Sequence, residues 1–281
     1  MTHPKPNPTS PLDSAIAEYY QQWPEERRLE DGPFLLEAIR TRELIERYSP
    51  KAPATVLDIG GAAGAYSFWL AEAGHSVHLL DAAPRLIAEA DRRNATSLHP
   101  LVSCQVGDAR SLSFADSIAD IVLLLGPLYH LTAALDRLQA LHEAARVLKP
   151  GGWLFASAIS RCASTLDGLA RPLFRDPQFA SMAERDLRDG QHRIVSGRID
   201  YFTTAYFHRP EDLHSEIVSA GLEPIGVFGI EGPGWLLPDV AERLANPDKR
   251  EDLLRAARML ESESSIQGAS AHLMGVARKP V

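Results

Sequence analysis

The chain has little of several features that mark specialised classes of protein. Its 281 residues include only two cysteines, Cys104 and Cys162, so we expect neither a disulfide framework nor a cysteine zinc site. No apolar run approaches the roughly 18 residues that a membrane-spanning helix needs. The first residues also lack the pattern of a secretory signal. We therefore expect a cytoplasmic protein without a membrane segment.

Positive charge is also scarce. The formal net charge is −8, with 29 Lys and Arg residues against 37 Asp and Glu residues, and the basic residues form no cluster. Because a nucleic-acid binder needs a basic face to neutralise phosphates, we expect no nucleic-acid partner. The ten histidines show neither H-x-x-x-H spacing nor a carboxylate in helical register, so the sequence predicts no metal site. His192, which stands among charged neighbours, is expected at the surface.

The most informative segment that is present runs from Val56 to Gly64. An apolar strand carries Asp58 near its end and breaks at once into a glycine-rich loop. Glycines let a backbone turn tightly and approach a ligand. The following run, Ala65–Ala73, predicts a helix whose N-terminus points at the same place. This arrangement is typical of a nucleotide-binding site. The glycines of the loop are Gly60, Gly61 and Gly64.

A nicotinamide dinucleotide is the first ligand to consider. Its fingerprint needs G-x-G-x-x-G and an acidic residue about 20 positions further on. Asp81 supplies the acid, but Ala62 and Ala65 stand where the second and third glycines are required. Asp58 is also poorly placed beside a diphosphate, whereas it suits a ligand that presents a cationic amine. A nicotinamide-dependent oxidoreductase stays as an alternative.

The chain resembles the class I S-adenosylmethionine-dependent methyltransferases, whose first motif reads D/E-x-G-x-G-x-G after an apolar strand. Here it reads Asp58-x-Gly60-x-Ala62-x-Gly64, with alanine in place of the middle glycine. The segment Gly126–Leu131 is similar in pattern to a bacterial branch near the ubiquinone and menaquinone methyltransferases, which does not carry over their substrate. Further matches follow in the family's order: Asp81 after the second strand, Gly107-Asp108-Ala109 after a third strand at 102–106, a fourth strand at 120–125, and Leu148–Phe155 as helix end, turn and fifth strand.

Strand and helix patterns alternate from Val56 onward, which predicts a doubly wound, mostly parallel α/β sheet. The resemblance implies a Rossmann-like sheet of seven strands with an antiparallel C-terminal hairpin at 222–230 and 270–278, and a helical cap. The expected organisation is a disordered tail at 1–11, an N-terminal helical lid at 12–50, a cofactor-binding core at 51–159, a cap insertion at 160–208, and the rest of the core at 209–281 with a helical insertion at 231–262.

The resemblance implies S-adenosylmethionine as the cofactor. Asp81 would accept hydrogen bonds from ribose hydroxyls, and Asp108 would lie near the adenine amino group, with a helix-capping role as its alternative. The expected cofactor-binding residues are Asp58, Gly60, Gly61, Gly64, Asp81, Asp108, Ala109 and Leu125.

Methyl transfer from a sulfonium is an in-line displacement that depends on positioning and on exclusion of water. An O–H or N–H acceptor can also need a base. His130 follows the carboxyl end of the fourth strand, where open α/β sheets place their chemistry, so it is the candidate base. Tyr129 beside it would orient the acceptor; for both residues, packing in the core is the alternative. Further candidates for acceptor contact, each with a structural role as alternative, are Tyr20, Arg28, Tyr201, Tyr206 and Trp235.

The sequence thus predicts a monomeric or homodimeric methyltransferase that acts on an O–H or N–H group of a small organic metabolite. An arginine such as Arg28 would suit an acceptor that carries a carboxylate or phosphate, because a guanidinium fork matches planar anions. A methyltransferase-like fold that binds a ligand without catalysis remains a second alternative.

Overall fold

A computed structural model describes residues 14–22, 25–30, 32–193 and 201–281. The expected tail at 1–11 lies outside the described residues. The strands are β1 Thr55–Ile59, β2 Ser76–Asp81, β3 Ser103–Val106, β4 Ala119–Leu124, β5 Leu148–Ser160, β6 Gln191–His192, β7 Ala205–His208, β8 Glu223–Gly229 and β9 His272–Arg278.

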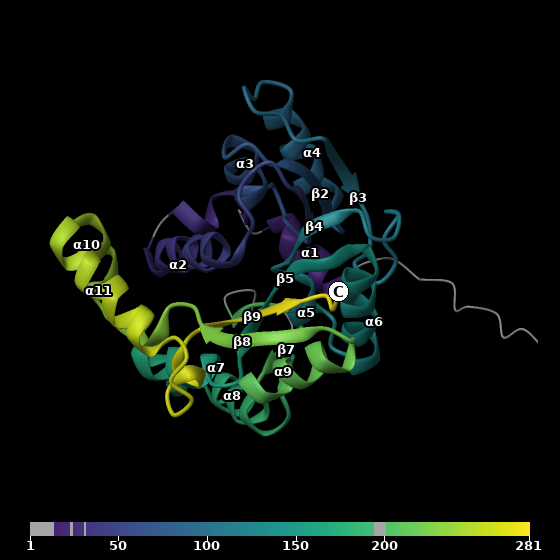
Figure 1. The fold of residues 1–281 in the computed structure, drawn as a ribbon. Helices are drawn as coiled ribbons and strands as arrows, with labels where there is room; N and C mark the ends of the chain where they lie inside the picture. The colour runs from purple at the N-terminus through teal and green to yellow at the C-terminus, as the bar shows by residue number, and fades with distance from the viewer. Residues whose placement is uncertain (1–13, 23–24, 31, 194–200) are drawn as a thin grey trace, which may run out of the picture.

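Helices surround these strands (Figure 1). The α-helices are α1 Ser14–Gln22, α2 Gly32–Tyr48, α3 Ala65–Glu72, α4 Pro84–Asn94, α5 Pro127–His130, α6 Ala134–Val147, α7 Ala163–Ala170, α8 Pro177–Asp189, α9 Pro210–Ser219, α10 Val240–Ala245 and α11 Pro247–Leu260. Short 3₁₀ turns are η1 Glu25–Glu30, η2 Pro172–Arg175, η4 Gly232–Leu236 and η5 Gln267–Ala269.

The strands form one mixed sheet. Parallel strands run in the order β3-β2-β1-β4-β5, after which β9 pairs antiparallel with β5 and β8 pairs antiparallel with β9. This confirms the doubly wound sheet and its antiparallel C-terminal hairpin. The sheet has nine strands within the described part of the chain, two more than the seven expected. The additional strands, β6 and β7, come from residues 160–208, and β7 extends the sheet beside the end of β5.

The central strands are buried on both faces, which explains their almost continuous apolar sequences. In β1, Leu57 and Ile59 belong to the apolar cluster that includes α6 and α9 on one face of the sheet, whereas Val56 belongs to the cluster with α2, α3 and α4 on the other. This alternation is the period of two that a strand imposes on its side chains. Because the sheet faces are apolar and covered, polar groups gather at the ends of the strands.

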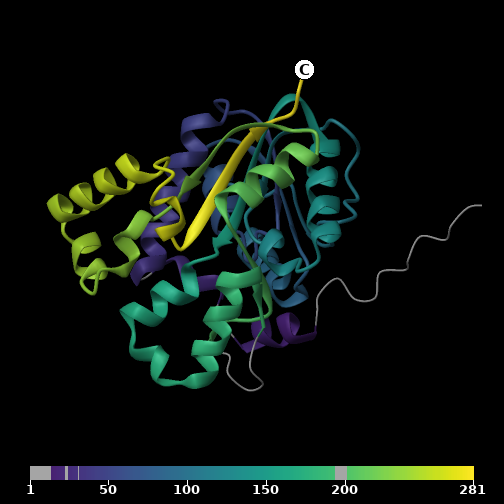
Figure 2. The same ribbon diagram turned by 90° about the horizontal axis from the view of Figure 1, so that it is seen from below.

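Residues 163–193 and 201–208, called the cap segment here, lie at the carboxyl end of the central strands together with α1 (Figure 2). A buried carboxylate organises this segment. Ser164 Oγ donates to Asp186 Oδ2 over 2.6 Å, and Nδ1 of His192 lies 2.8 Å from the same oxygen. The expectation that His192 lies at the surface is therefore wrong. Asp186 lies on the buried side of the preceding helix α8, and the imidazole of His192 is buried because it contacts this carboxylate.

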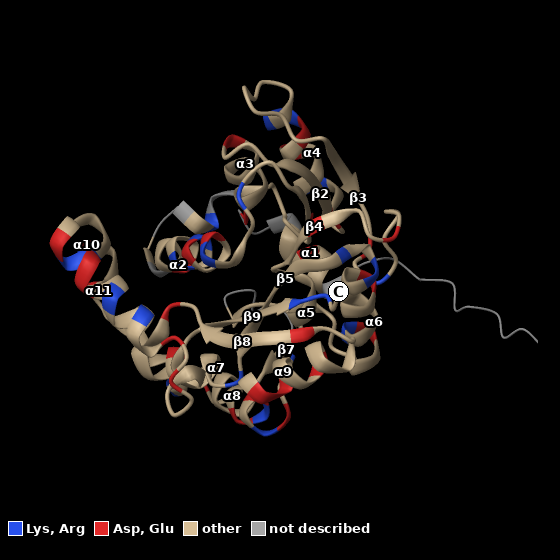
Figure 3. Cartoon of the chain, in the orientation of Figure 1, with Lys and Arg blue, Asp and Glu red and all other residues tan. Residues whose placement is uncertain are grey.

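The helices α10 and α11 pack against α2 through apolar side chains such as Leu36, Leu244 and Leu254. Charges of both signs follow α2 and α11 (Figure 3). Among them, Arg40 is fully buried, donates from Nε to the carbonyl of Ile230 over 3.2 Å, and forms an ion pair with Glu261. Arg47 pairs with the same carboxylate from a more exposed position. Among the described helices, none combines the length and the apolar character that crossing a membrane would take.

The two arginines that share Glu261 allow a direct test of how burial changes the contribution of an ion pair to the free energy of unfolding. We expect Arg40→Ala to lower the free energy of unfolding by about 3–5 kcal/mol, because it removes the fully buried partner of Glu261 and leaves that carboxylate only the more exposed Arg47. Arg47→Ala should lower it by less than about 1 kcal/mol, because an exposed pair is screened by solvent. Urea unfolding of both variants beside the wild type measures the difference. Equal losses would contradict this account.

Candidate active site

A cavity of about 1040 Å³ lies at the carboxyl edge of the sheet. Its walls are formed by the loops that follow β1, β2, β3 and β4, together with α1 and η1 from the N-terminal part of the chain. Ligands of open α/β sheets bind in such a crevice outside the carboxyl ends of the strands. The cavity is therefore the candidate active site.

The glycine-rich loop after β1 has a shape that requires its glycines. Gly60 has a φ of 75°, and a Cβ atom built on it would lie 2.5 Å from the ring of Pro127. A Cβ on Gly61 would lie 2.5 Å from the carboxyl group of Asp58. Ala62 stands at the family's middle glycine and still adopts a left-handed φ of 51°. An alanine there costs about 1 kcal/mol relative to glycine, yet it preserves the backbone path.

Asp58 is a buried carboxylate whose hydrogen bonding is incomplete. Ser67 Oγ donates to its Oδ2 over 2.6 Å, whereas Oδ1 is buried and has no hydrogen-bond partner among the described residues. Burial raises the pKa of Asp58 to about 6. A buried acceptor without a donor is costly. A ligand that brings an ammonium group would satisfy this oxygen and restore the charged form.

Asp81 ends β2 on the neighbouring wall of the cavity. The backbone N–H groups of Ala62 and Ala83 donate to its two oxygens over 2.8 Å each. A carboxylate has about four acceptor sites, so both oxygens keep capacity for ligand hydroxyls. Burial raises the pKa of Asp81 to about 6 as well. Two orienting bonds and remaining acceptor capacity are what a residue that binds a ribose diol needs.

Of the other expected cofactor residues, Asp108, Ala109 and Leu125 also line the cavity, whereas Gly64 lies outside its lining. Asp108 faces Arg110, whose Nη2 donates to Oδ2 over 2.6 Å and whose backbone N–H donates to Oδ1 over 2.9 Å. Ala109 is buried beside it. The carbonyl of Leu125 accepts hydrogen bonds from Ser157 Oγ over 2.7 Å and from the hydroxyl of Tyr129 over 3.3 Å. Any further polar contact at Leu125 would therefore come from its N–H group.

Tyr20 from α1 and His130 from α5 meet in the cavity wall. The hydroxyl of Tyr20 lies 2.7 Å from Nε2 of His130, and the two rings contact edge to face. Burial lowers the pKa of His130 to about 4, although a backbone contact with Thr204 opposes the shift. The imidazole is therefore neutral near pH 7. Tyr129 packs against the same ring at a centroid distance of 4.7 Å.

Arg28 lines the cavity, but its guanidinium is engaged by protein carboxylates. Its Nε donates to Glu25 over 2.7 Å, and its two terminal nitrogens donate to Glu37 over 2.5 and 3.1 Å. Burial works to lower the pKa of Arg28, but Glu37 and Glu25 outweigh it and raise the pKa. The pairing leaves this guanidinium without the open fork that an anionic acceptor would need.

The remaining predicted acceptor residues lie outside the lining of the cavity, and each has a partner within the fold. The hydroxyl of Tyr201 donates to Asp176 over 2.8 Å inside the cap segment. Arg137 stacks 3.7 Å above the ring of Tyr206. Nε1 of Trp235 donates to the carbonyl of Ala269 over 2.9 Å. These contacts support the structural alternatives for the three side chains.

The sequence analysis did not single out Glu25, Glu37 and Tyr66 as site residues. Glu25 and Tyr66 line the cavity. Glu37 lies outside the lining and accepts hydrogen bonds from Arg28. Glu25 precedes Arg28 by three residues, the spacing of an ion pair along a helical turn, and this was a usable signal. Tyr66 and Glu37 belong to apolar helical stretches in which no local pattern marks a cavity residue.

Comparisons with known proteins agree with this geometry. Residues 57–156 match the family model described as a methyltransferase domain. The ubiquinone/menaquinone biosynthesis C-methyltransferase UbiE of Acidiphilium cryptum is 30% identical over 70% of this chain and 79% of its own length. The ubiquinone biosynthesis O-methyltransferase of Xylella fastidiosa is 34% identical over 69% of this chain and 70% of its own. Several other curated methyltransferases are matched over only about half of their length.

A solved structure of an S-adenosylmethionine-dependent methyltransferase from Methanosarcina mazei shares the fold. It superposes with a TM-score of 0.58 at 18% sequence identity, covering 85% of this chain and 97% of the other. The comparisons decide between the two cofactor classes that the glycine-rich loop left open. The chain belongs to the class I S-adenosylmethionine-dependent methyltransferases, and S-adenosylmethionine is its cofactor.

Proposed function

We propose that this methyltransferase transfers the methyl group to an O–H or N–H group of a small organic molecule that is neutral or carries an amine. The observation that carries the proposal is the neutral His130 imidazole, buried in the cavity wall beside Tyr20. A neutral imidazole is able to accept a proton. An O–H or N–H acceptor loses a proton on methylation and can use such a base, whereas an acceptor that loses no proton has no need of one.

The two ends of the cavity suit different ligands. We assign the cofactor to the end formed by the glycine-rich loop, where Asp58 would receive the methionine ammonium and Asp81 the ribose hydroxyls. Asp108 and Ala109 would border the adenine, and Leu125 the methionine chain. The bound cofactor supplies an electrophilic methyl carbon on a sulfonium. The glycines let the backbone come close to it.

The acceptor would occupy the end lined by Tyr20, Arg28, Tyr129 and His130. The proton that the acceptor loses as its lone pair forms the new bond passes to the hydroxyl of Tyr20, which gives its own proton to Nε2 of His130. The N-terminal segment covers this end, since Arg85 Nε donates to the carbonyl of Tyr20 over 2.9 Å and Tyr19 contacts Phe202 of the cap segment. Such a cover excludes water from the displacement.

Charge in the cavity favours a neutral or cationic acceptor. Among its described lining residues, seven carboxylate side chains face three guanidinium groups. Arg110 is paired with Asp108 and Asp136, and Arg28 with Glu25 and Glu37. A carboxylate or phosphate on the acceptor would therefore enter a field of its own sign. The relatives named above methylate carbon in one case and oxygen in another, so the acceptor atom has to be argued from the site.

Screening of acceptors tests the proposal. Phenols, alcohols and amines, each paired with an analogue that carries an added carboxylate, are incubated with S-adenosylmethionine, and formation of S-adenosylhomocysteine is followed. We expect the uncharged or amine member of each pair to be turned over at least 10-fold faster. Preference for the carboxylate members, or product methylated at carbon, would overturn the proposal.

Cofactor binding should depend on pH through the raised pKa values of Asp58 and Asp81. Both carboxyl groups protonate as the pH falls through about 6, and each then loses its charged form as hydrogen-bond acceptor. We expect the affinity for S-adenosylhomocysteine to rise from pH 5 to pH 7. Asp58→Asn should lose about 1.5–3 kcal/mol of binding, the value of a hydrogen bond to a charged group. Isothermal titration calorimetry across this range measures both effects.

The variant Asp167→Asn is a matched control, because Asp167 on α7 pairs with Arg171, the residue that follows this helix, and both lie outside the cavity. It should leave the affinity and its pH profile unchanged. A flat profile between pH 5 and pH 7, or an Asp58→Asn variant that binds as tightly as the wild type, would contradict the assignment.

His130 is expected to act on turnover and not on cofactor binding. With an acceptor from the screen, His130→Gln should lower kcat by about 10²–10⁴-fold, the usual contribution of a general base. Its affinity for S-adenosylhomocysteine should stay within about twofold of the wild type. Stopped assays and calorimetry on the same preparations provide the two values. His99→Gln, which changes an exposed histidine, is the control.

A loss of cofactor affinity that matches the loss of turnover would show that His130 supports the shape of the cavity. Unchanged kcat in His130→Gln would remove the base from the proposed mechanism.

A further inference from the structure

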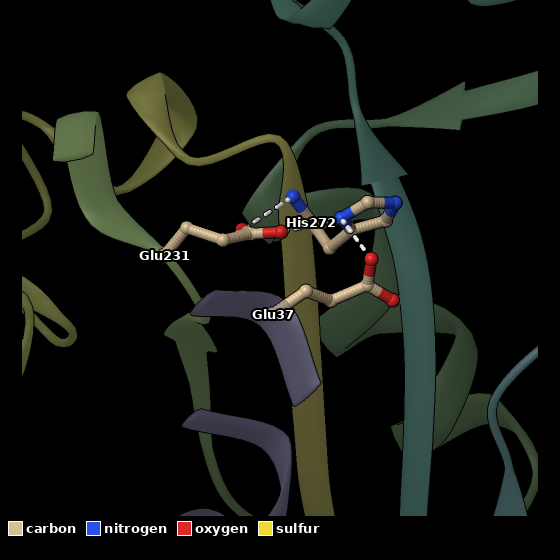
Figure 4. Close-up of side chains that lie close together, drawn as sticks. All are labelled: Glu37, Glu231 and His272. Carbon is tan, nitrogen blue, oxygen red and sulfur yellow. Dashed lines mark hydrogen bonds and ion pairs between the residues drawn. The ribbon is translucent and has the colours of Figure 1, made fainter. Parts of the chain in front are cut away.

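Three ionisable side chains converge behind the cavity wall, from segments that are far apart in the sequence (Figure 4). Glu37 lies on α2, Glu231 follows β8 by two residues, and His272 is the first residue of β9. Because β8 and β9 are antiparallel, the end of one and the start of the other meet at the same edge of the sheet. This edge is also the one that holds the cavity.

The group is compact and largely buried. Nδ1 of His272 lies 2.6 Å from Oε1 of Glu231 and 3.7 Å from Oε2 of Glu37. Each of the three residues offers one ligand atom, a nitrogen from His272 and an oxygen from each glutamate, and these atoms all lie within 4.8 Å of one another. Tetrahedral bonds of about 2.0–2.1 Å to a metal place its ligand atoms about 3.3 Å apart. The distance from Nδ1 to Glu231 is shorter than this ligand separation, and the distance from Nδ1 to Glu37 is longer.

Hydrogen bonds around the group hold both carboxylates in orientation. Ser270 Oγ and the backbone N–H of His272 donate to Oε2 of Glu231 over 2.7 and 3.0 Å. Oε1 of Glu231 is thereby directed at the imidazole. On the opposite side, Arg28 holds Glu37 through its two terminal nitrogens. Outer contacts of this kind orient the ligands in metal sites.

The charges of the group leave room for a cation. Glu25 and Glu37 pair with the guanidinium of Arg28, and Glu231 pairs with His272. With a neutral imidazole, these side chains would carry a surplus of two negative charges largely out of solvent. A proton on the imidazole would offset part of this surplus. A divalent cation would offset all of it.

We propose that Glu37, Glu231 and His272 form a binding site for a divalent transition-metal ion such as Zn²⁺. Imidazole nitrogen and carboxylate oxygen are both ligands that Zn²⁺ accepts, and three protein ligands leave a position for water. The ion would join α2 to the last two strands of the sheet. Through Glu37 it would also hold Arg28 in the cavity wall. The sequence analysis predicts no metal site because the three ligands share no local spacing.

Metal titration of the full chain tests the site. The protein is dialysed against a chelator, returned to metal-free buffer at pH 7.5, and titrated with ZnCl₂ by calorimetry. We expect one ion to bind per chain. Glu231→Gln and His272→Gln should each weaken this binding at least 100-fold, whereas His99→Gln, at an exposed histidine, should leave it unchanged. Circular dichroism and binding of S-adenosylhomocysteine confirm that each variant is folded.

Co²⁺ provides a readout on the wild type that needs no variant. A site with one imidazole and two carboxylates should give visible absorption bands of bound Co²⁺ that Zn²⁺ displaces at one equivalent. Absence of Zn²⁺ binding and of these bands, or equal binding by wild type and His272→Gln, would overturn the proposal. The group would then be an ion-pair network closed by the proton on His272. The outcome is independent of the acceptor, so it does not depend on the proposed function.

Discussion

The burial of the central strands on both faces is the constraint on which the rest of this structure depends. β1 and β4 have no solvent-exposed face, so the polar groups they carry are confined to their ends. Asp58 is placed at such an end, inside the protein but open to the cavity. Its raised pKa follows from this position, because the sheet that orients the carboxyl group also removes it from water. A cationic ligand is the natural complement to that burial.

A second group of interactions joins the peripheral segments to the sheet. Arg40 is buried between α2 and the C-terminal helices, and Arg28 is held between Glu25 and Glu37 at the cavity. In both cases a guanidinium is enclosed by carboxylates from elements that the minimal sheet does not contain. The segments outside residues 57–156, which match the family model, therefore complete the wall of the cavity and contribute charged side chains to it.

Local patterns were sufficient for the sheet and for two carboxylates of the cavity wall. An apolar strand that ends in a carboxylate places Asp58 and Asp81 without knowledge of the rest of the chain, and alternating strands and helices define the sheet. The pairing of Tyr20 with His130 could not be predicted, since 110 positions separate them and no periodicity joins the two segments. The burial of His192 was missed for a similar reason. Its charged neighbours suggest a surface, whereas its partner Asp186 lies on the inward side of α8.

The contacts of α2 also bear on the order in which the molecule is assembled. Arg40 and its partner Glu261 are separated by 221 positions, and Glu37 waits for β9 at the end of the chain. A ribosome releases α2 long before either partner exists. Until then, Glu37 and Arg40 have only their nearer partners, Arg28 and Glu43. Native contacts across such separations form late in folding. The contacts that join α2 to Glu261 and to β9 are therefore among the last to be completed during synthesis, after β1 to β5 have left the ribosome.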